Sequence, residues 1–257
     1  MMRCLCPRWF LSILAGFASA RAAEPVASPE AAQEWGVHDP ARPRPAAVAP
    51  RPAEAIAALS SPPADAILLF DGSDLAAWQS SIWKVENGYL EVVPKSAPLI
   101  SRQAFGSCHL HLEWRSPTPA TGDGQNRGNS GVFLQGRYEV QVLNNYENTT
   151  YADGYAGAAY GQNPPRVDPC RPAGEWNTYD IFFRAPRFAA DGSVTRRAAV
   201  TLLFNGVLVQ DNFEFTGPTA HKKRPPYSAH PAEVPLELQE HGCRVRFRNI
   251  WIVPVAD

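Results

Sequence analysis

Glu139 and Gln141 are two polar side chains set in an apolar segment, and their types suit acid/base or sugar-binding chemistry. They alternate with Tyr138, Val140 and Val142. Because a strand sends successive side chains to opposite faces, the three apolar residues would point into a core, and Glu139 and Gln141 would lie together on the other face. A carboxyl can transfer a proton and a carboxamide can hydrogen-bond a hydroxyl. The pair therefore predicts a face that binds or transforms a sugar.

A late segment offers a second set of the same kind. Residues 236–241 alternate in the same way, which puts Glu237, Gln239 and His241 on one face. If the two strands lie in one sheet, Gln239 and His241 would converge with the first pair. Histidine suits a base, because its ordinary pKa of about 6.5 allows proton transfer at neutral pH. We predict a catalytic set of His241 as base, Glu139 as partner acid, and Gln239, with Glu237 merely solvated.

Further candidates come from loops and strand ends, which often line clefts. Trp176 suits the core as well as a sugar platform, and Arg248 could pair with a carboxylate or hold substrate. The residues expected to contact substrate are Gln141, Asn129, Tyr160, Trp176, Asn177 and Arg248. A divalent cation, Ca²⁺, Mn²⁺ or similar, could be held by Glu139, His241 and Glu113, although no spacing in the chain specifies a metal site. No organic cofactor is expected.

The elements that must position these residues are short strands. The Asn-Gly pairs at Asn87 and Asn205 each sit between alternating runs, the strongest short-range signal for a hairpin. Residues 108–114 also alternate, with Leu, Leu and Trp on one face and Glu113 on the other. Many short strands with turn signals predict an all-β antiparallel sandwich or barrel. The irregular stretch 144–174 is long enough to suggest a functional loop.

Composition excludes some classes of protein. The 257 residues are 45% hydrophobic and carry a net charge of −1, which allows one sizeable core and shows no basic run for a nucleic acid. Residues 1–22 have the pattern of a signal peptide, with an apolar run from Trp9 to Phe17 followed by Ala-x-Ala sites. The run is too short for a membrane span. We expect a periplasmic or secreted protein with no integral membrane span.

The domain organisation follows from the next segment. Residues 23–63 are rich in alanine and proline with almost no aliphatic periodicity, so we expect a disordered linker. A single domain would then occupy residues 64–257. Three cysteines follow the signal peptide, Cys108, Cys170 and Cys243, and the sequence selects no disulfide pair among them. It does not indicate an oligomeric state either.

Motifs along this domain occur in a consistent order. They include Leu69-Phe-Asp-Gly-Ser-Asp-Leu75, Trp83-Lys-Val-Glu-Asn-Gly-Tyr-Leu90, Asn129-Ser-Gly-Val-Phe-Leu134, Tyr138-Glu-Val-Gln-Val-Leu143, Pro172-Ala-Gly-Glu-Trp-Asn177 and Leu238-Gln-Glu-His-Gly242. Together they resemble the 3-keto-disaccharide hydrolase domain family, from about residue 66 to residue 254. The resemblance implies a concanavalin-like jelly roll of two antiparallel sheets.

The resemblance also implies action on glycosides whose sugar carries a ketone at C3. The ketone acidifies the C2–H bond, so a base can remove that proton and the aglycone can leave C1, after which water can add back. This route needs a base near C2, an electrophile at the C3 oxygen and an acid near the leaving oxygen. His241 and Glu139 are the residues expected to supply the base and the acid.

Two alternatives stay open. A laminarinase-like glucanase of the same fold carries Glu-x-Asp-x-x-Glu where this chain has Glu139-Val-Gln-Val-Leu-Asn144, so both later acids are missing. A non-catalytic carbohydrate-binding module of the lectin type would keep the cleft and would not need His241.

Overall fold

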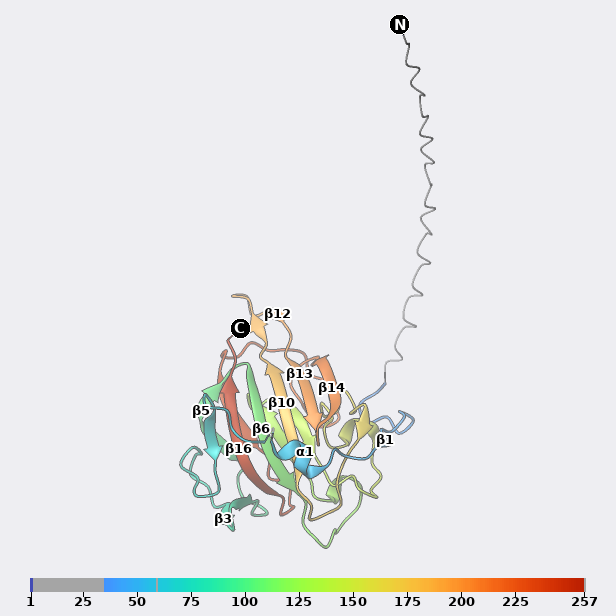
Figure 1. Ribbon diagram of the computed structural model, residues 1–257, viewed down its shortest axis with the longest axis vertical. Helices are drawn as coiled ribbons and strands as arrows, with labels where there is room; N and C mark the ends of the chain where they lie inside the picture. Colours follow the sequence, from blue (N-terminus) through green and yellow to red (C-terminus); the bar gives the residue numbers. More distant parts are fainter. Residues whose placement is uncertain (2–34, 59, 257) are drawn as a thin grey trace. The chain divides into compact units, whose positions relative to one another are not determined.

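The residues described by the computed structural model are 1, 35–58 and 60–256, and they are almost entirely β (Figure 1). The strands are β1 (Ala46–Ala47), β2 (Ile67–Phe70), β3 (Lys84–Glu86), β4 (Tyr89–Glu91), β5 (Leu99–Phe105), β6 (Cys108–Arg115), β7 (Ser130–Leu134), β8 (Tyr138–Val142), β9 (Val167–Asp168), β10 (Asn177–Arg184), β11 (Arg187–Phe188), β12 (Val194–Arg196), β13 (Ala199–Phe204), β14 (Val207–Glu214), β15 (Val234–Leu238) and β16 (Arg246–Pro254). The helical elements of these residues are α1 (Ala53–Ala57) and two 3-10 turns, Gly124–Asn126 and Ala152–Gly154.

Two antiparallel sheets form a sandwich. The larger has the order β14-β13-β10-β6-β16-β4-β3, with β2 also paired to β16, and the smaller has the order β5-β15-β7-β8. Figure 1 shows β14, β13, β10, β6 and β16 side by side. This confirms the predicted all-β jelly-roll sandwich. Two small two-stranded sheets, the parallel pair β1–β9 and the antiparallel pair β11–β12, are additions that the sequence analysis did not predict.

Both predicted Asn-Gly hairpins are present. Asn87-Gly88 joins β3 to β4, and Asn205-Gly206 joins β13 to β14. The φ angles are positive at all four residues, between 49° and 76°. A two-residue turn of this kind matches the twist of the flanking strands, and asparagine and glycine tolerate the left-handed backbone best.

The core lies between the sheets and takes one face of each central strand. Leu110, Leu112 and Trp114 of β6 are completely buried, as the alternation predicted. The opposite face of β6 is not solvated, however. His111 on that face is also completely buried, because Trp251 of β16 stacks on its ring at a centroid distance of 5.0 Å.

Residues 35–58 and 60–63, called the N-terminal arm below, pack on the sandwich. β1 in the arm pairs with β9, Ile56 of α1 is 3% exposed, and the Ser60 carbonyl accepts hydrogen bonds from Asn249 and Trp251. The expectation of a disordered linker is therefore wrong for this part of residues 23–63. The arm has few large apolar residues for a core of its own, but several of its polar groups hydrogen-bond to the domain. The proposed signal peptide lies outside the described residues, apart from Met1.

The three cysteines among the described residues carry free thiols. Burial raises the pKa of Cys108 and of Cys170 to about 12, so neither thiol is prepared to act as a thiolate nucleophile. No helix in the described part of the chain is both long enough and apolar enough to cross a membrane.

Candidate active site

A cavity of about 240 Å³ lies over β7 and β8 of the smaller sheet. Six residues predicted from the sequence line it: Asn129, Glu139, Gln141, Tyr160, Gln239 and His241. The sheet order explains this, because β15 pairs with β7 and β7 pairs with β8. Side chains from β8 and from the end of β15 therefore reach the same space from neighbouring strands. The roles assigned to these six residues remain predictions.

Glu139 is the buried acid of this cavity, with 4% of its surface exposed. Burial, and secondarily the negative charge of Glu237, raise the pKa of its carboxyl to about 8. Its backbone N–H donates to Thr219 Oγ1 at 3.0 Å, which fixes the residue at the cavity floor. In the amide orientation that satisfies Gln141, the Nε2 of Gln141 donates to Glu139 Oε1 at 3.0 Å. Glu139 is therefore a neutral, held carboxylic acid at pH 7.

Gly131 of β7 leaves the room that this carboxyl occupies. A Cβ atom on Gly131 would lie 2.5 Å from Glu139 Oε1, far inside van der Waals contact. The backbone of Gly131 is also used, since its carbonyl accepts a hydrogen bond from the Gln239 N–H at 2.9 Å. One glycine thus admits the acid and anchors the segment that carries Gln239 and His241.

Gln239 and His241 follow directly after the end of β15. The Ser130 hydroxyl donates to the Gln239 carbonyl at 2.6 Å, so the segment stays beside β7 after regular strand pairing ends at Leu238. The Oε1 atom of Gln239 is buried and has no hydrogen-bond partner among the described residues. His241 is exposed at the rim of the cavity. The site thus has an unused acceptor near its floor and an imidazole open to solvent.

Two loops form the opposite wall. Tyr160 comes from the long stretch 144–174, and its N–H donates to the Glu139 carbonyl at 3.2 Å. Its hydroxyl shares a hydrogen bond of 2.7 Å with the hydroxyl of Tyr151 and lies 3.5 Å from His221 Nδ1. Burial raises the pKa of Tyr160 far above its ordinary value, so this hydroxyl stays protonated. The loop stretch that the sequence indicated as functional therefore contributes directly to the cavity.

Four further residues line the cavity that no sequence pattern had indicated: Phe133, Thr219, Ala220 and His221. Phe133 lies on β7 and the other three lie in the loop after β14. No alternation marks a loop residue, so the only available signal was a histidine in an irregular polar stretch.

Four predicted site residues lie elsewhere, around the larger sheet. Trp176, Arg248 and Glu113 line a separate cavity of about 400 Å³. Arg248 Nε and Nη2 each lie 2.7 Å from Glu113 Oε2, and its guanidinium lies 4.2 Å from the Trp176 ring centroid. Asn177 is 1% exposed and accepts a hydrogen bond from Asn205 Nδ2. The structure does not bring these four residues to the cavity over β7 and β8, because β6, β10 and β16 belong to the other sheet, and their roles remain predictions.

The same separation removes Glu113 from the predicted metal set, which leaves Glu139 and His241 at the cavity. Among the described residues, no three His, Cys, Asp or Glu side chains are grouped to hold a metal ion. A cation in the cavity would find Glu139, His241 and the unpartnered Oε1 of Gln239 as donors. Oxygen and imidazole donors of this kind suit a divalent cation.

A family model described as the 3-keto-alpha-glucoside-1,2-lyase-like domain matches residues 65–253. The chain belongs to this family. The family assignment confirms the resemblance noted in the sequence and makes the cavity part of a carbohydrate-active domain of the glycoside hydrolase or lyase type. The matched region begins after the N-terminal arm, so the arm lies outside the residues that the family model covers.

Solved structures agree with this assignment. A candidate glycosyl hydrolase from Parabacteroides distasonis is 43% identical, with a TM-score of 0.73 over 75% of this chain and 85% of that chain. A second candidate glycosyl hydrolase from the same organism is 20% identical, covers 74% of this chain and 99% of that chain, and shares the fold with a TM-score of 0.55. No curated protein matches the chain.

Proposed function

We propose that the cavity cleaves the glycosidic bond of 3-keto-glycosides by C2 proton abstraction and elimination, with or without hydration of the product. One observation carries the proposal. A buried carboxyl with its pKa raised to about 8 shares the cavity with a solvent-accessible imidazole. Environments that separate an acid from a base in this way suit proton transfer at two atoms of one substrate.

His241 would take the proton from C2, whose acidity comes from the C3 ketone. The electrons of the C2–H bond form the C1=C2 double bond while the C1–O bond breaks. Protonated Glu139 would donate its proton to the departing oxygen, so the aglycone leaves as a neutral alcohol. The amides of Gln141 and Gln239 would hydrogen-bond the sugar oxygens. Transfer of a proton from His241 to Glu139 restores the resting state, and addition of water across the double bond gives net hydrolysis.

The size of the cavity is consistent with a small substrate. Its volume of about 240 Å³ is below the range of about 300–1,000 Å³ that is usual for drug-sized ligands. One sugar ring would fill it, with the glycosidic oxygen within reach of Glu139 and the rest of the aglycone extending toward the open rim. We further propose that the enzyme acts in the periplasm or outside the cell. A divalent cation held at Gln239 Oε1 would polarise the ketone oxygen, while Glu139 and His241 would keep their roles as acid and base.

The test compares a 3-keto-glucoside with its unoxidised parent, using the full chain. We expect aglycone release from the keto form alone, and at least about a hundredfold loss in His241→Ala, the usual scale for a general base. His109→Ala is the matched control, since His109 lies on β6 in the larger sheet. Repeating the assay after EDTA treatment decides the use of a cation.

Two results would contradict the proposal. Release of the aglycone from the unoxidised parent would indicate ordinary glycosidase chemistry. Binding of both sugars without release from either would indicate a non-catalytic carbohydrate-binding module.

A further inference from the structure

We propose that the N-terminal arm is a positioning element for the sugar cavity, in which His38 fixes the wall made by Tyr151, Tyr160 and His221. This inference rests on the proposed function for its kinetic consequence, although its structural part can be tested separately. The arm precedes residue 65, where the family match begins, so His38 lies outside the matched region and the wall that it contacts lies within it.

His38 is held by a single buried carboxylate. Its backbone N–H donates to Asp153 Oδ2 at 3.0 Å, and its Nδ1 lies 3.1 Å from Asp153 Oδ1. The two side chains are 8% and 1% exposed. Burial alone would raise the pKa of Asp153, but the hydrogen bonds from His38 outweigh it and lower that pKa. His38 has a φ of +58°, an unfavourable backbone for a histidine that these two bonds stabilise.

The imidazole of His38 supports the cavity wall from behind. Its ring lies 3.8 Å from the Tyr151 ring, 5.1 Å from the Tyr160 ring and 5.8 Å from the His221 ring, measured between centroids. Tyr151 in turn is hydrogen-bonded to the Tyr160 hydroxyl, and Tyr160 and His221 line the cavity. Removing the His38 ring would leave a space behind Tyr151 and release the two residues that face the substrate.

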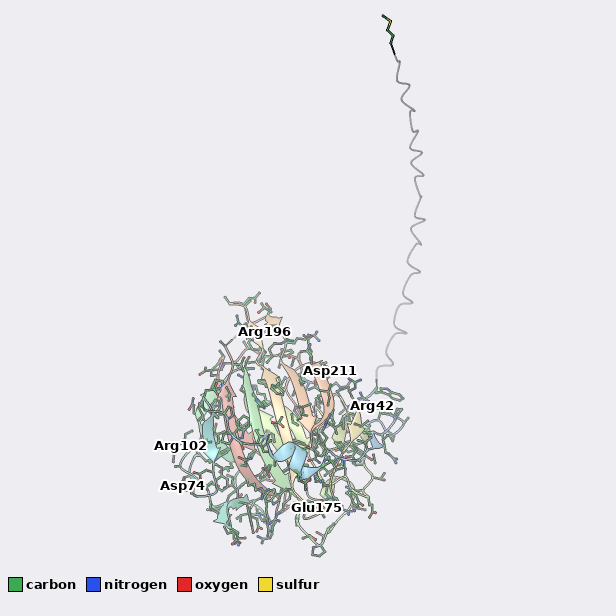
Figure 2. The ribbon with its side chains drawn as sticks, viewed as in Figure 1. Arg42, Asp74, Arg102, Glu175, Arg196 and Asp211 are labelled. Atoms are coloured by element: carbon green, nitrogen blue, oxygen red, sulfur yellow. The ribbon has the colours of Figure 1, made fainter. Side chains whose placement is uncertain are left out.

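A second arm residue, Arg42, contacts the first wall loop at Gln162, whose side chain joins that loop to the second. Arg42, labelled in Figure 2, donates from Nη1 to the Gln162 carbonyl at 3.1 Å. The side chain of Gln162 accepts from the Thr216 N–H at 2.8 Å and donates to the Gly217 carbonyl at 3.1 Å. Thr219, two residues on, accepts the hydrogen bond from the Glu139 N–H. The arm is thus linked through both loops to the residue that we propose as the acid.

The kinetic consequence follows from where this wall would act. Tyr160 and His221 would contact the bound sugar throughout the reaction, whereas the proposed proton transfers use Glu139 and His241. A loosened wall should weaken ground-state and transition-state binding alike, which raises KM and leaves kcat nearly unchanged. A mere loss of fold stability would instead reduce the fraction of active enzyme and therefore the apparent kcat.

The experiment uses three variants of the full chain. His38→Ala removes the ring and its bond to Asp153, and we expect KM for the 3-keto-glucoside to rise about tenfold. His38→Asn should recover part of the effect, because asparagine tolerates a positive φ and can donate to Asp153. Arg51→Ala is the matched control, since Arg51 is also on the arm but donates to the Gly206 carbonyl in the β13–β14 turn.

Hydrogen exchange supplies a readout that does not depend on turnover. In His38→Ala we expect faster exchange in residues 151–163 and 216–221, with residues 108–114 of β6 unchanged because they pair only within the larger sheet. Unchanged exchange in both loops would overturn the inference, as would an equal rise of KM in Arg51→Ala. If the wild type releases no aglycone while His38→Ala still speeds exchange in these loops, the proposed function fails and the positioning role of the arm stands.

Discussion

At the scale of single residues, Glu139 owes its proposed chemistry to its surroundings. It is a strand residue with one apolar neighbour on each side, yet its carboxyl faces a cavity instead of open solvent. Loss of hydration favours the neutral form, and Glu237 nearby disfavours a second negative charge. The acid function is thus a property of the site and not of glutamate alone.

The pH dependence of activity tests this role. Glu139 can donate a proton only while protonated, so we expect kcat/KM to fall as the pH rises through about 8, the pKa of its carboxyl. Glu139→Gln should lose about 10²–10⁴-fold in kcat, the usual contribution of a general acid, and its residual activity should lack this alkaline limb. Steady-state rates measured from about pH 6 to about pH 10, at intervals of about one pH unit, test both effects. Retention of the limb in the variant would assign it to another group.

Stability should report the same carboxyl with a defined sign. The pKa is near 4.5 for a free glutamate and about 8 in the folded chain, so between these values the folded state keeps a proton that the unfolded state releases. The free energy of unfolding of the wild type should therefore fall as pH rises across this window, by at most about 1.4 kcal/mol per pH unit. Glu139→Gln removes this contribution. Urea unfolding of both proteins at about pH 5, 6 and 7 measures the free energy of unfolding of each. An equal dependence on pH in the two proteins would contradict the raised pKa.

At the scale of elements, β7 and β8 build the site as a pair. β8 supplies the acid, and β7 supplies Gly131, which is opposite Gln141 in the register, leaves room for the Glu139 carboxyl and holds Gln239 through its carbonyl. A strand glycine ordinarily weakens a sheet, so its presence in the middle of β7 marks a close approach of another group. Here that group is the carboxyl of Glu139.

Gly131→Ala should therefore damage activity more than folding. The added methyl group would displace the Glu139 carboxyl, and we expect kcat to fall at least about tenfold, since misplacement by about 1 Å can cost far more. Gly106→Ala is the control, because a Cβ there meets the Ala232 carbonyl at 3.4 Å and Glu233 Cγ at 3.7 Å, both ordinary contacts. Circular dichroism and thermal melting establish that both variants fold. Equal kinetics for the two variants would show that Gly131 has no role in placing the acid.

At the scale of the whole molecule, the two sheets carry different kinds of polar cluster. The cavity of the smaller sheet holds unpaired acid/base groups. The cluster on the larger sheet is satisfied internally, since Glu113 accepts from Arg248 and from Asn249. Asn249 also donates to the Ser60 carbonyl, so this cluster holds the N-terminal arm on the sheet. We therefore propose that this cluster contributes to the stability of the fold and not to catalysis.

Arg248→Ala should lower stability and leave chemistry intact. Glu113 is 10% exposed and would lose its charged partner, so we expect a loss of about 1–3 kcal/mol in the free energy of unfolding. The values of kcat and KM should change less than about twofold, which is small against the losses expected at the cavity. Arg166→Ala is the control, because its ion pair with Asp211 is 61% exposed on both sides and contributes little. A selective rise of KM in Arg248→Ala would return this arginine to the substrate site.

Part of the fold and of the site could be predicted from local rules. Alternation along residues 138–142 determined that Glu139 and Gln141 share a face opposite to Tyr138, and the Asn-Gly pairs determined two hairpins. These features depend on residues next to one another in the chain. They can therefore be predicted from the sequence, as could the membership of the 3-keto-alpha-glucoside-1,2-lyase-like family.

Only the tertiary structure decided which polar faces meet. Glu113 was a candidate metal ligand and Arg248 a candidate substrate contact, and the order of strands put both on the other sheet. Strand order depends on pairing between segments far apart in sequence, and no local pattern encodes it. The same holds for His38, because its partner, the carboxylate of Asp153, is 115 residues away in the sequence. The sequence determined which residues could act together, and long-range packing determined which of them do, because it sets both their neighbours and their exposure to water.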